Sequence, residues 1–289
     1  MRLLEAPPMK ILLAGATGVI GRALVPRLVE AGHEVSGTTR HRAKGKFLEG
    51  LGAHPVIVDV LDAKRLRKAV KAERPDVIVH QLTDLSNEDF AANGALRVAG
   101  TRNLVDAALS VGVETMIAQS IAWLYMRGEE PAVEVDALDP ALQPYQGIAS
   151  LEQEVARMPK GVVLRYGALY GPGTWYAPDG AIADRVRRGE LALTPAWTSF
   201  VHVEDAAAAA VAALDWERGP VNIVDDEPAT FQEWLPSYAE ALGAPEPRSI
   251  RHAAATGRPV SNAKAKSLGW TPQYPTWRTG LLTEVAPAE

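Results

Sequence analysis

The chain has 289 residues, which is enough for one large domain or two modest domains with buried cores. It contains no cysteine, so disulfide bonds, thiol catalysis and cysteine metal sites are excluded, and we predict no metal site. A formal net charge of −5 argues against nucleic acid or an anionic membrane as the main partner. No apolar run reaches membrane-spanning length. We therefore expect a cytoplasmic protein whose residues 1–8 form an N-terminal arm.

A glycine-rich turn follows the first predicted strand. An apolar run from Met9 to Ala14 meets Gly15, Gly18 and Gly21, and a helical pattern begins at once. Glycine allows a tight turn and lets the backbone approach a pyrophosphate, which then binds at the free N–H groups of the helix. The order of strand, turn and helix predicts a dinucleotide site. Its expected contacts are Gly15, Thr17, Gly18, Val19, Ile20 and Gly21.

The second predicted strand, Glu34 to Thr39, runs into Arg40 with no acidic residue nearby. In this kind of site a carboxylate holds the adenosine ribose 2′-OH, whereas a basic residue accommodates a 2′-phosphate. Thr39 and Arg40 therefore favour NADP(H) over NAD(H) as the cofactor. The alternative is that Arg40 belongs only to a solvated loop.

Further predicted strands at 55–60, 76–80, 115–120 and 161–166 alternate with helices at 63–72 and 145–158. This alternation indicates the α/β class, with a Rossmann-type doubly wound parallel sheet and a ligand crevice at the carboxyl ends of its strands. His80 is expected to be structural. The remaining expected cofactor contacts follow strand ends: Asp59, Val60, Gln81, Leu82, Tyr166, Gly167 and Ala168.

The order of elements changes beyond residue 168. The segment 170–180 is rich in turns and aromatic residues, which suits a pocket wall or lid. We expect a short strand at 199–205 whose Asp205 caps a helix over 206–214. Residues 9–168 then form the dinucleotide-binding core, completed by about 199–224. Residues 169–198 and 225–289 form a smaller substrate-binding lobe and lid.

Several motifs in this order resemble the extended and atypical short-chain dehydrogenases/reductases of the NAD(P)-dependent epimerase/dehydratase superfamily. The resemblance extends over nearly the whole chain and implies a Rossmann fold with a nicotinamide cofactor. The matching motifs are the glycine turn 15–21, Asp59-Val60, His80-Gln81-Leu82, Gly100-Thr101-Arg102-Asn103-Leu104, Tyr170-Gly171-Pro172-Gly173, Val201-His202-Val203-Glu204-Asp205 and Leu268-Gly269-Trp270-Thr271-Pro272.

The family's catalytic set is incomplete in this chain. The resemblance implies a proton-transferring tyrosine and a lysine four residues later. In one register these positions are Tyr145 and Ala149, and in the other they are Gln146 and Ser150, so the lysine is absent in both. We take Tyr145 and Gln146 as candidate catalytic residues.

Two further family positions are changed. The catalytic serine of the family motif Ser-x-x-x-Tyr is replaced by Ile121, although Ser120 lies next to it. Ser120 is therefore the third candidate catalytic residue. The family's asparagine before Gly-Thr falls on Arg97.

Loss of the whole set is similar to what is found in atypical family members that reduce angucyclinone polyketides in antibiotic biosynthesis. The resemblance therefore implies an NADPH-dependent ketoreductase of an aromatic polyketide, acting as a monomer or homodimer. A hydroxyl beside the substrate carbonyl would supply the proton that the protein lacks. The candidate substrate residues are Trp123, Trp175, Trp197 and His202, and for each tryptophan a packing role is an equally good interpretation.

Two other functions remain open. A sugar-nucleotide epimerase or reductase would need basic side chains for a diphosphate, and the segment 170–180 contains none. A catalytically inactive NADP(H)-binding sensor protein would also account for the lost catalytic set.

Overall fold

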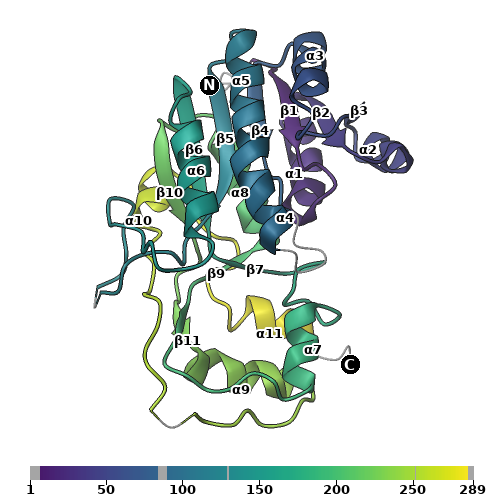
Figure 1. Ribbon diagram of the computed structural model, residues 1–289. Helices are drawn as coiled ribbons and strands as arrows, with labels where there is room; N and C mark the ends of the chain where they lie inside the picture. Colours follow the sequence, from purple (N-terminus) through teal and green to yellow (C-terminus); the bar gives the residue numbers. More distant parts are fainter. Residues whose placement is uncertain (1–6, 84–89, 129, 251, 286–289) are drawn as a thin grey trace, which may run out of the picture. The chain divides into compact units, whose positions relative to one another are not determined.

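The computed structural model describes residues 7–83, 90–128, 130–250 and 252–285, so most of the predicted arm lies outside the described residues. Its main feature is a seven-stranded sheet in the order β10-β6-β5-β4-β1-β2-β3 (Figure 1). This order confirms the predicted doubly wound Rossmann-type sheet. The strands are β1 (Lys10–Ala14), β2 (Glu34–Thr39), β3 (His54–Ile57), β4 (Val77–His80), β5 (Thr115–Ile121), β6 (Lys160–Tyr166) and β10 (Gly219–Ile223).

The central strand β1 is paired in parallel with β2 and β4, and its Leu12 lies opposite Ser36 and Ile78. Leu12 and Ile78 are fully buried. Strands of a parallel sheet that is covered on both faces read as continuous apolar runs, as β1 and β4 do. The apolar runs in the sequence therefore predicted these strands correctly, although the strand predicted at 55–60 ends at Ile57.

Contacts divide the chain into two units, of which the first comprises Met1–Gln119, Gln146–Val163 and Ala213–Gly219. Its helices are α1 (Val19–Glu30), α2 (Gly45–Gly50), α3 (Ala63–Glu73), α4 (Phe90–Ala95), α5 (Thr101–Ser110) and α6 (Tyr145–Val155), with a 3-10 turn η1 (Arg42–Lys44) and a π-helical turn η2 (Leu96–Gly100).

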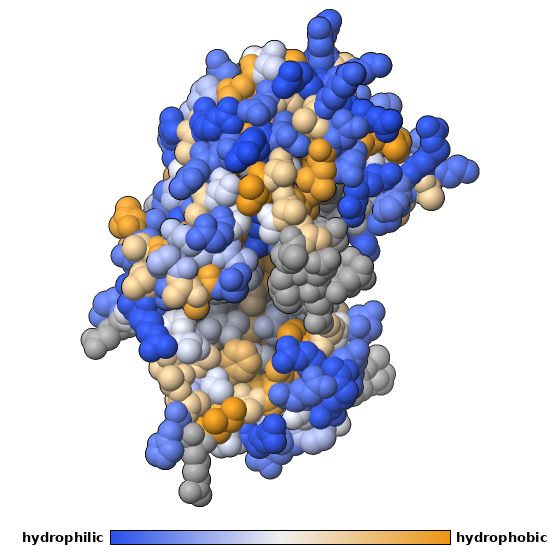
Figure 2. Space-filling model, viewed as in Figure 1, coloured by the Kyte–Doolittle hydropathy of each residue, from blue (hydrophilic) through white to orange (hydrophobic). Residues whose placement is uncertain are grey.

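Helix α3 illustrates how this unit is assembled. Its N-terminus is capped by Asp62, whose carboxylate accepts the Arg65 N–H at 3.0 Å. Leu66 and Val70, four residues apart, are buried against α5, which lies beside α3 (Figure 1). The opposite face of α3 carries exposed basic side chains, and Figure 2 is predominantly hydrophilic in the region of this helix.

The second unit comprises Ser120–Tyr145, Leu164–Ala212 and Pro220–Glu289. Its short strands are β7 (Ala168–Tyr170) parallel to β9 (Phe200–His202), and β8 (Trp197–Thr198) antiparallel to β11 (Ala229–Thr230). Its helices are α7 (Ala181–Arg187), α8 (Val203–Ala212), α9 (Phe231–Ala241), α10 (Ala263–Ser267) and α11 (Gly280–Val285).

The core of the second unit is aromatic. Phe200, Trp234 and Trp277 are fully buried, and the rings of Phe200 and Trp234 meet edge to face at 5.6 Å between centroids. Helix α9 begins with a capping box in which Thr230 and Glu233 each satisfy the other's backbone N–H.

The predicted cap by Asp205 is wrong. Helix α8 begins at Val203, so Asp205 lies inside its first turn. The carboxylate of Asp205 instead accepts the backbone N–H groups of Gln273 at 2.7 Å and Tyr274 at 2.9 Å. This buried carboxylate therefore holds a segment almost seventy residues away in the sequence.

Two features are absent from the described residues. No helix in this part of the chain has the length and apolar character needed to cross a membrane. Within the same residues, no cluster of histidine, aspartate and glutamate side chains has an arrangement that could hold a metal ion.

Candidate functional site

The glycine turn between β1 and α1 has the geometry of an anion-binding loop. Gly15 adopts a φ of +94°, and its carbonyl accepts the Gly18 N–H at 2.9 Å. Helix α1 then starts at Val19 with no side-chain cap and no acidic residue in its first turn. An uncapped, acid-free helix N-terminus after a glycine turn favours a phosphate group. Thr17 and Gly18 lie in this turn, and Val19 and Ile20 begin α1. Their contacts with a cofactor stay predictions.

Close packing explains two of the three glycines. A Cβ atom on Gly21 would lie 2.2 Å from the Gly15 carbonyl oxygen. A Cβ atom on Gly15 would lie 2.5 Å from the carbonyl oxygen of Gln81, which follows β4. Any side chain at Gly15 or Gly21 would collide with backbone atoms of neighbouring segments. The turn therefore packs directly against both α1 and the end of β4.

The other predicted cofactor residues of the first unit lie at strand ends. Thr39 is buried at the end of β2, and its hydroxyl accepts the His41 N–H at 3.2 Å, whereas Arg40 is exposed. The carboxylate of Asp59 accepts the Leu61 N–H at 2.9 Å. Val60, Gln81 and Leu82 follow β3 and β4. The cofactor roles of these residues stay predictions.

The positions of the missing catalytic set are occupied by side chains that cannot replace it. Helix α6 contains no lysine between Tyr145 and Val155, and Gln146 is exposed near its start. In the second unit, Ile121 is buried and apolar, and the neighbouring Ser120 is fully buried. Glutamine has no titratable proton, so the described side chains at these positions offer one phenol, that of Tyr145.

A buried cation lies in the first unit, in the π-helical turn η2. Arg97 is 4 % exposed, and burial lowers the pKa of its guanidinium to about 10. Fully buried His80 lies nearby, with its Nε2 2.9 Å from the Thr101 hydroxyl and its Nδ1 accepting the Leu82 N–H at 3.2 Å. Burial, together with the charge of Arg97, lowers the pKa of His80 to about 4. His80 is therefore neutral and structural at neutral pH, while Arg97 keeps its charge.

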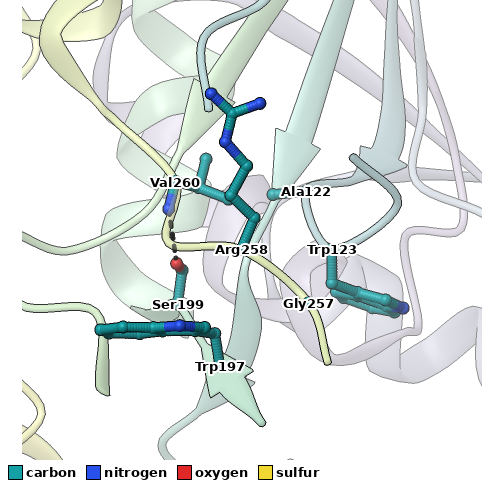
Figure 3. Close-up of a pocket in the computed structure, with 7 residues that line it drawn as sticks. All are labelled: Ala122, Trp123, Trp197, Ser199, Gly257, Arg258 and Val260. Carbon is teal, nitrogen blue, oxygen red and sulfur yellow. Dashed lines mark hydrogen bonds between the residues drawn. The ribbon is translucent and has the colours of Figure 1, made fainter. Parts of the chain in front are cut away.

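The second unit brings two of the predicted substrate residues together. Trp123 and Trp197 line one small hollow with Ala122, Ser199, Gly257, Arg258 and Val260 (Figure 3). The Ser199 hydroxyl accepts the Val260 N–H at 3.1 Å, and Arg258 is paired with Asp136 at 3.1 Å. The space open to the centre of a water-sized sphere is about 10 Å³, which admits a single water. In this conformation the hollow does not admit a polycyclic ligand.

The other two predicted substrate residues lie elsewhere in this unit. Trp175 belongs to the turn after β7, where its carbonyl accepts the Ile182 N–H at 2.9 Å. His202 is buried, stacks on Tyr274 at 3.7 Å between ring centroids, and its Nε2 lies 2.8 Å from Glu284. Both its ring nitrogens are engaged, because Nδ1 accepts the Glu204 N–H at 3.2 Å. Their substrate roles stay predictions.

The remaining predicted cofactor residues lie at the end of β6 and directly after it, in the second unit. Tyr166 is buried and donates its hydroxyl hydrogen to the Ala206 carbonyl at 3.1 Å. A Cβ atom on Gly167 would lie 2.4 Å from the Ser199 carbonyl oxygen, so this position requires glycine. Ala168 begins β7. Sequence reasoning missed Ser199, Gly257 and Arg258 as lining residues, because they come from separate segments without a shared motif.

Comparison with known proteins identifies the family of this chain. The sequence pattern of the NAD dependent epimerase/dehydratase family matches residues 11–224. A Streptomyces protein named 3-diazoavenalumate denitrifying reductase is 42 % identical over 308 aligned positions, which cover 96 % of this chain and all of that protein. Among solved structures, UDP-glucose 4-epimerase of Thermus thermophilus in complex with NAD superposes with a TM-score of 0.77 at 27 % identity, covering 96 % of this chain and 98 % of the other.

The UDP-glucose 4-epimerase of Thermotoga maritima with UDP-glucose also superposes with a TM-score of 0.77, at 22 % identity. The match covers 96 % of this chain and 97 % of the other, and it shows that the two proteins share a fold. The family match spans the glycine turn, β4, α6 and the positions where the catalytic set is altered. This chain is a member of the NAD dependent epimerase/dehydratase family.

Proposed function

We propose that this protein is a nicotinamide-dependent reductase that transfers a hydride to an aromatic substrate without a proton from a tyrosine–lysine pair. Family membership, the uncapped N-terminus of α1 and a relative that is named a reductase support this proposal. A bound nicotinamide would supply the hydride. The residues Gly15 to Gly21 would hold the pyrophosphate through backbone N–H groups.

The observation that carries the proposal is the composition of α6, which lacks the family lysine in both registers. In one register Gln146 and Ser150 replace tyrosine and lysine, and in the other Tyr145 is kept but Ala149 replaces the lysine. A positioned general acid is typically worth a factor of about 10² to 10⁴ in rate. An enzyme without it needs a substrate for which the proton is supplied in another way or is not required at all.

An aryl diazonium group requires no proton, and we favour it as the reduced group. Hydride supplies the one hydrogen that the aryl carbon needs, the C–N bond breaks and dinitrogen leaves, so atoms and charge balance with oxidised cofactor as the second product. The name of the 42 % identical relative, a denitrifying reductase of a diazo compound, supports this choice.

An aromatic polyketide ketone with a hydroxyl beside the carbonyl is the second candidate substrate. Hydride adds to the carbonyl carbon, the neighbouring phenol gives its proton to the carbonyl oxygen, and a phenolate remains. A proton donor held in the substrate itself has a high effective molarity. The tryptophans at 123, 175 and 197 are the sequence argument for this candidate, but the hollow that Trp123 and Trp197 line is too small for a polycyclic ligand in this conformation.

The test is oxidation of NADPH by the purified protein with two substrate panels. One panel contains aryl diazonium acids, including 3-diazoavenalumate, and the other contains hydroxyanthraquinone and angucyclinone ketones with and without the adjacent hydroxyl. We expect deuterium from NADPH labelled at nicotinamide C4 to appear at the aryl carbon of the denitrified product. Tyr145→Phe should keep the rate within about twofold, because no enzymatic proton is needed.

Other outcomes would change the assignment. If deuterium appears at a carbinol carbon, and only with ketones that carry the adjacent hydroxyl, the protein is a polyketide ketoreductase. A loss of about 10² or more in Tyr145→Phe would restore a tyrosine acid and contradict the proposal. Turnover of a sugar nucleotide would favour an epimerase or reductase of that class, and cofactor binding without any turnover would favour the sensor protein.

For the cofactor we propose NADP(H). Exposed Arg40 follows β2 directly and β2 ends on Thr39 with no acid, which supports recognition of a 2′-phosphate. Arg40→Ala is expected to weaken NADPH about tenfold or more and to leave NADH unchanged, because the lost contact is a charge-assisted one to phosphate. Fluorescence titration with both cofactors measures this, with exposed Arg42→Ala as the matched control. Equal losses for NADPH and NADH would contradict the prediction.

A further inference from the structure

Arg97 is a buried charge without a visible counter-charge. Its side chain is 4 % exposed, and its pKa of about 10 keeps the guanidinium protonated at neutral pH. Across residues 7–83, 90–128, 130–250 and 252–285, no side chain or backbone group forms a hydrogen bond or ion pair with it. A guanidinium has five N–H donors, and a buried charge is costly unless it is paired.

The neighbours of Arg97 do not neutralise it. Fully buried His80 is uncharged, because its Nδ1 accepts the Leu82 N–H and its Nε2 is bonded to the Thr101 hydroxyl. The charge of Arg97 itself contributes to keeping His80 unprotonated. Among the described residues, the local charge is therefore that of a single cation enclosed by the fold.

The stem of Arg97 lies against the helix that has lost its catalytic residues. A Cβ atom on Gly147 of α6 would lie 3.5 Å from the Arg97 Cδ atom and 3.6 Å from its Cβ atom. Gly147 directly follows Gln146, the position of the family tyrosine in one register. The absence of a side chain at 147 lets Arg97 pack directly on α6, next to this position.

We propose that the Arg97 guanidinium binds an oxyanion of the substrate, a carboxylate or a phenolate, beside the first turn of α6. This inference rests on the proposed function, in which hydride transfer must be directed without a tyrosine–lysine pair. Arg97 in η2 then supplies a positive charge in place of the lysine that α6 lacks. Its guanidinium binds and orients the substrate and does not transfer a proton. The relative's named substrate, 3-diazoavenalumate, is itself the anion of an acid.

The test is calorimetric titration of the NADP⁺-saturated protein with matched pairs of ligands. One pair is cinnamate and cinnamamide, which differ in the carboxylate. The other is 4-nitrophenolate and 4-nitroanisole at pH 8, which differ in the phenolate. We expect at least one oxyanion to bind about tenfold or more tightly than its neutral partner, and the pair that shows this ratio identifies the group.

Variants assign the preference to Arg97. Arg97→Met should remove the ratio while keeping the affinity of the neutral ligand, and Arg97→Lys should retain part of the ratio because it keeps the charge. A packing role would instead lower both affinities equally. Arg102→Met is the matched control. Arg102 lies in the first turn of α5, directly after η2, and it is exposed and paired with Glu154. This control variant should leave both ratios unchanged.

Three outcomes would overturn the inference. They are equal binding within both pairs, a ratio that survives Arg97→Met, and no binding of either oxyanion at millimolar concentration. Because this titration needs no turnover, its result is independent of the reductase assay. If the protein prefers an oxyanion but reduces no substrate in the assay, the Arg97 binding site is supported and the proposed function is contradicted.

Discussion

Gly21→Ala is expected to abolish dinucleotide binding and to lower the free energy of unfolding by roughly 3 kcal/mol or more. The added Cβ atom would lie 2.2 Å from the Gly15 carbonyl oxygen and 2.7 Å from the backbone of Ala16. These are backbone atoms, which cannot rotate away as the end of a flexible side chain can. The turn must move, and because it is the pyrophosphate site that we propose, stability and cofactor affinity should fall together.

Two other glycines provide a matched series. Gly32 has a φ of +86° with open space around its Cα, so Gly32→Ala should cost about 1–2 kcal/mol through backbone strain alone. Gly50 has neither a positive φ nor a close neighbour, so Gly50→Ala should be neutral or stabilise by up to about 1 kcal/mol. Urea unfolding and NADPH titration measure all three variants. Full NADPH affinity in Gly21→Ala would show that the turn does not bind the cofactor.

The sequence predicts this turn because all of its determinants are local. Strand β1, the three glycines and α1 follow one another without interruption, and each has a conformational reason that needs no distant residue. The same holds for β4, whose apolar run identified it. Asp205 was misassigned because its partners, the N–H groups of Gln273 and Tyr274, are remote in the sequence.

The rest of the candidate site depends on long-range packing. The hollow beside Trp123 and Trp197 is completed by Ser199, Gly257 and Arg258, which carry no common pattern. The sequence identified Arg97 as an unusual residue at the family's asparagine position. Its burial in η2, its contact with Gly147 and its lack of a described counter-charge follow only from the tertiary structure.

Asp225→Asn is expected to change the pH dependence of stability more than substitution of an exposed acidic residue does. Asp225 is 2 % exposed, and its Oδ2 has no hydrogen-bond partner among the described residues. Burial raises the pKa of this carboxyl to about 8, against opposing hydrogen bonds from the backbone N–H groups of Glu227 and Trp277. The folded protein therefore holds a proton on Asp225 at neutral pH, while the unfolded chain releases it above about pH 4.

This difference fixes the sign of the effect. Unfolding releases a proton between about pH 4 and pH 8, so the contribution of Asp225 to stability is complete below pH 4 and is lost as the pH rises through 8. Asparagine resembles the protonated acid and does not ionise. Asp225→Asn should be within about 1–2 kcal/mol of the wild type at pH 5 and should become the more stable protein by a few kcal/mol at pH 9.

Urea unfolding at pH 5, 7 and 9 measures this crossing, with exposed Asp179→Asn of the same unit as a control that should shift stability equally at all three values. Curves that stay parallel for Asp225→Asn and the wild type would mean that Asp225 ionises in the folded state without cost. A buried carboxylate can do so only if a donor reaches Oδ2, and the described residues supply none. The pH dependence therefore distinguishes the two cases, because a proton retained on Asp225 makes the two stability curves cross, whereas a donor at Oδ2 keeps them parallel.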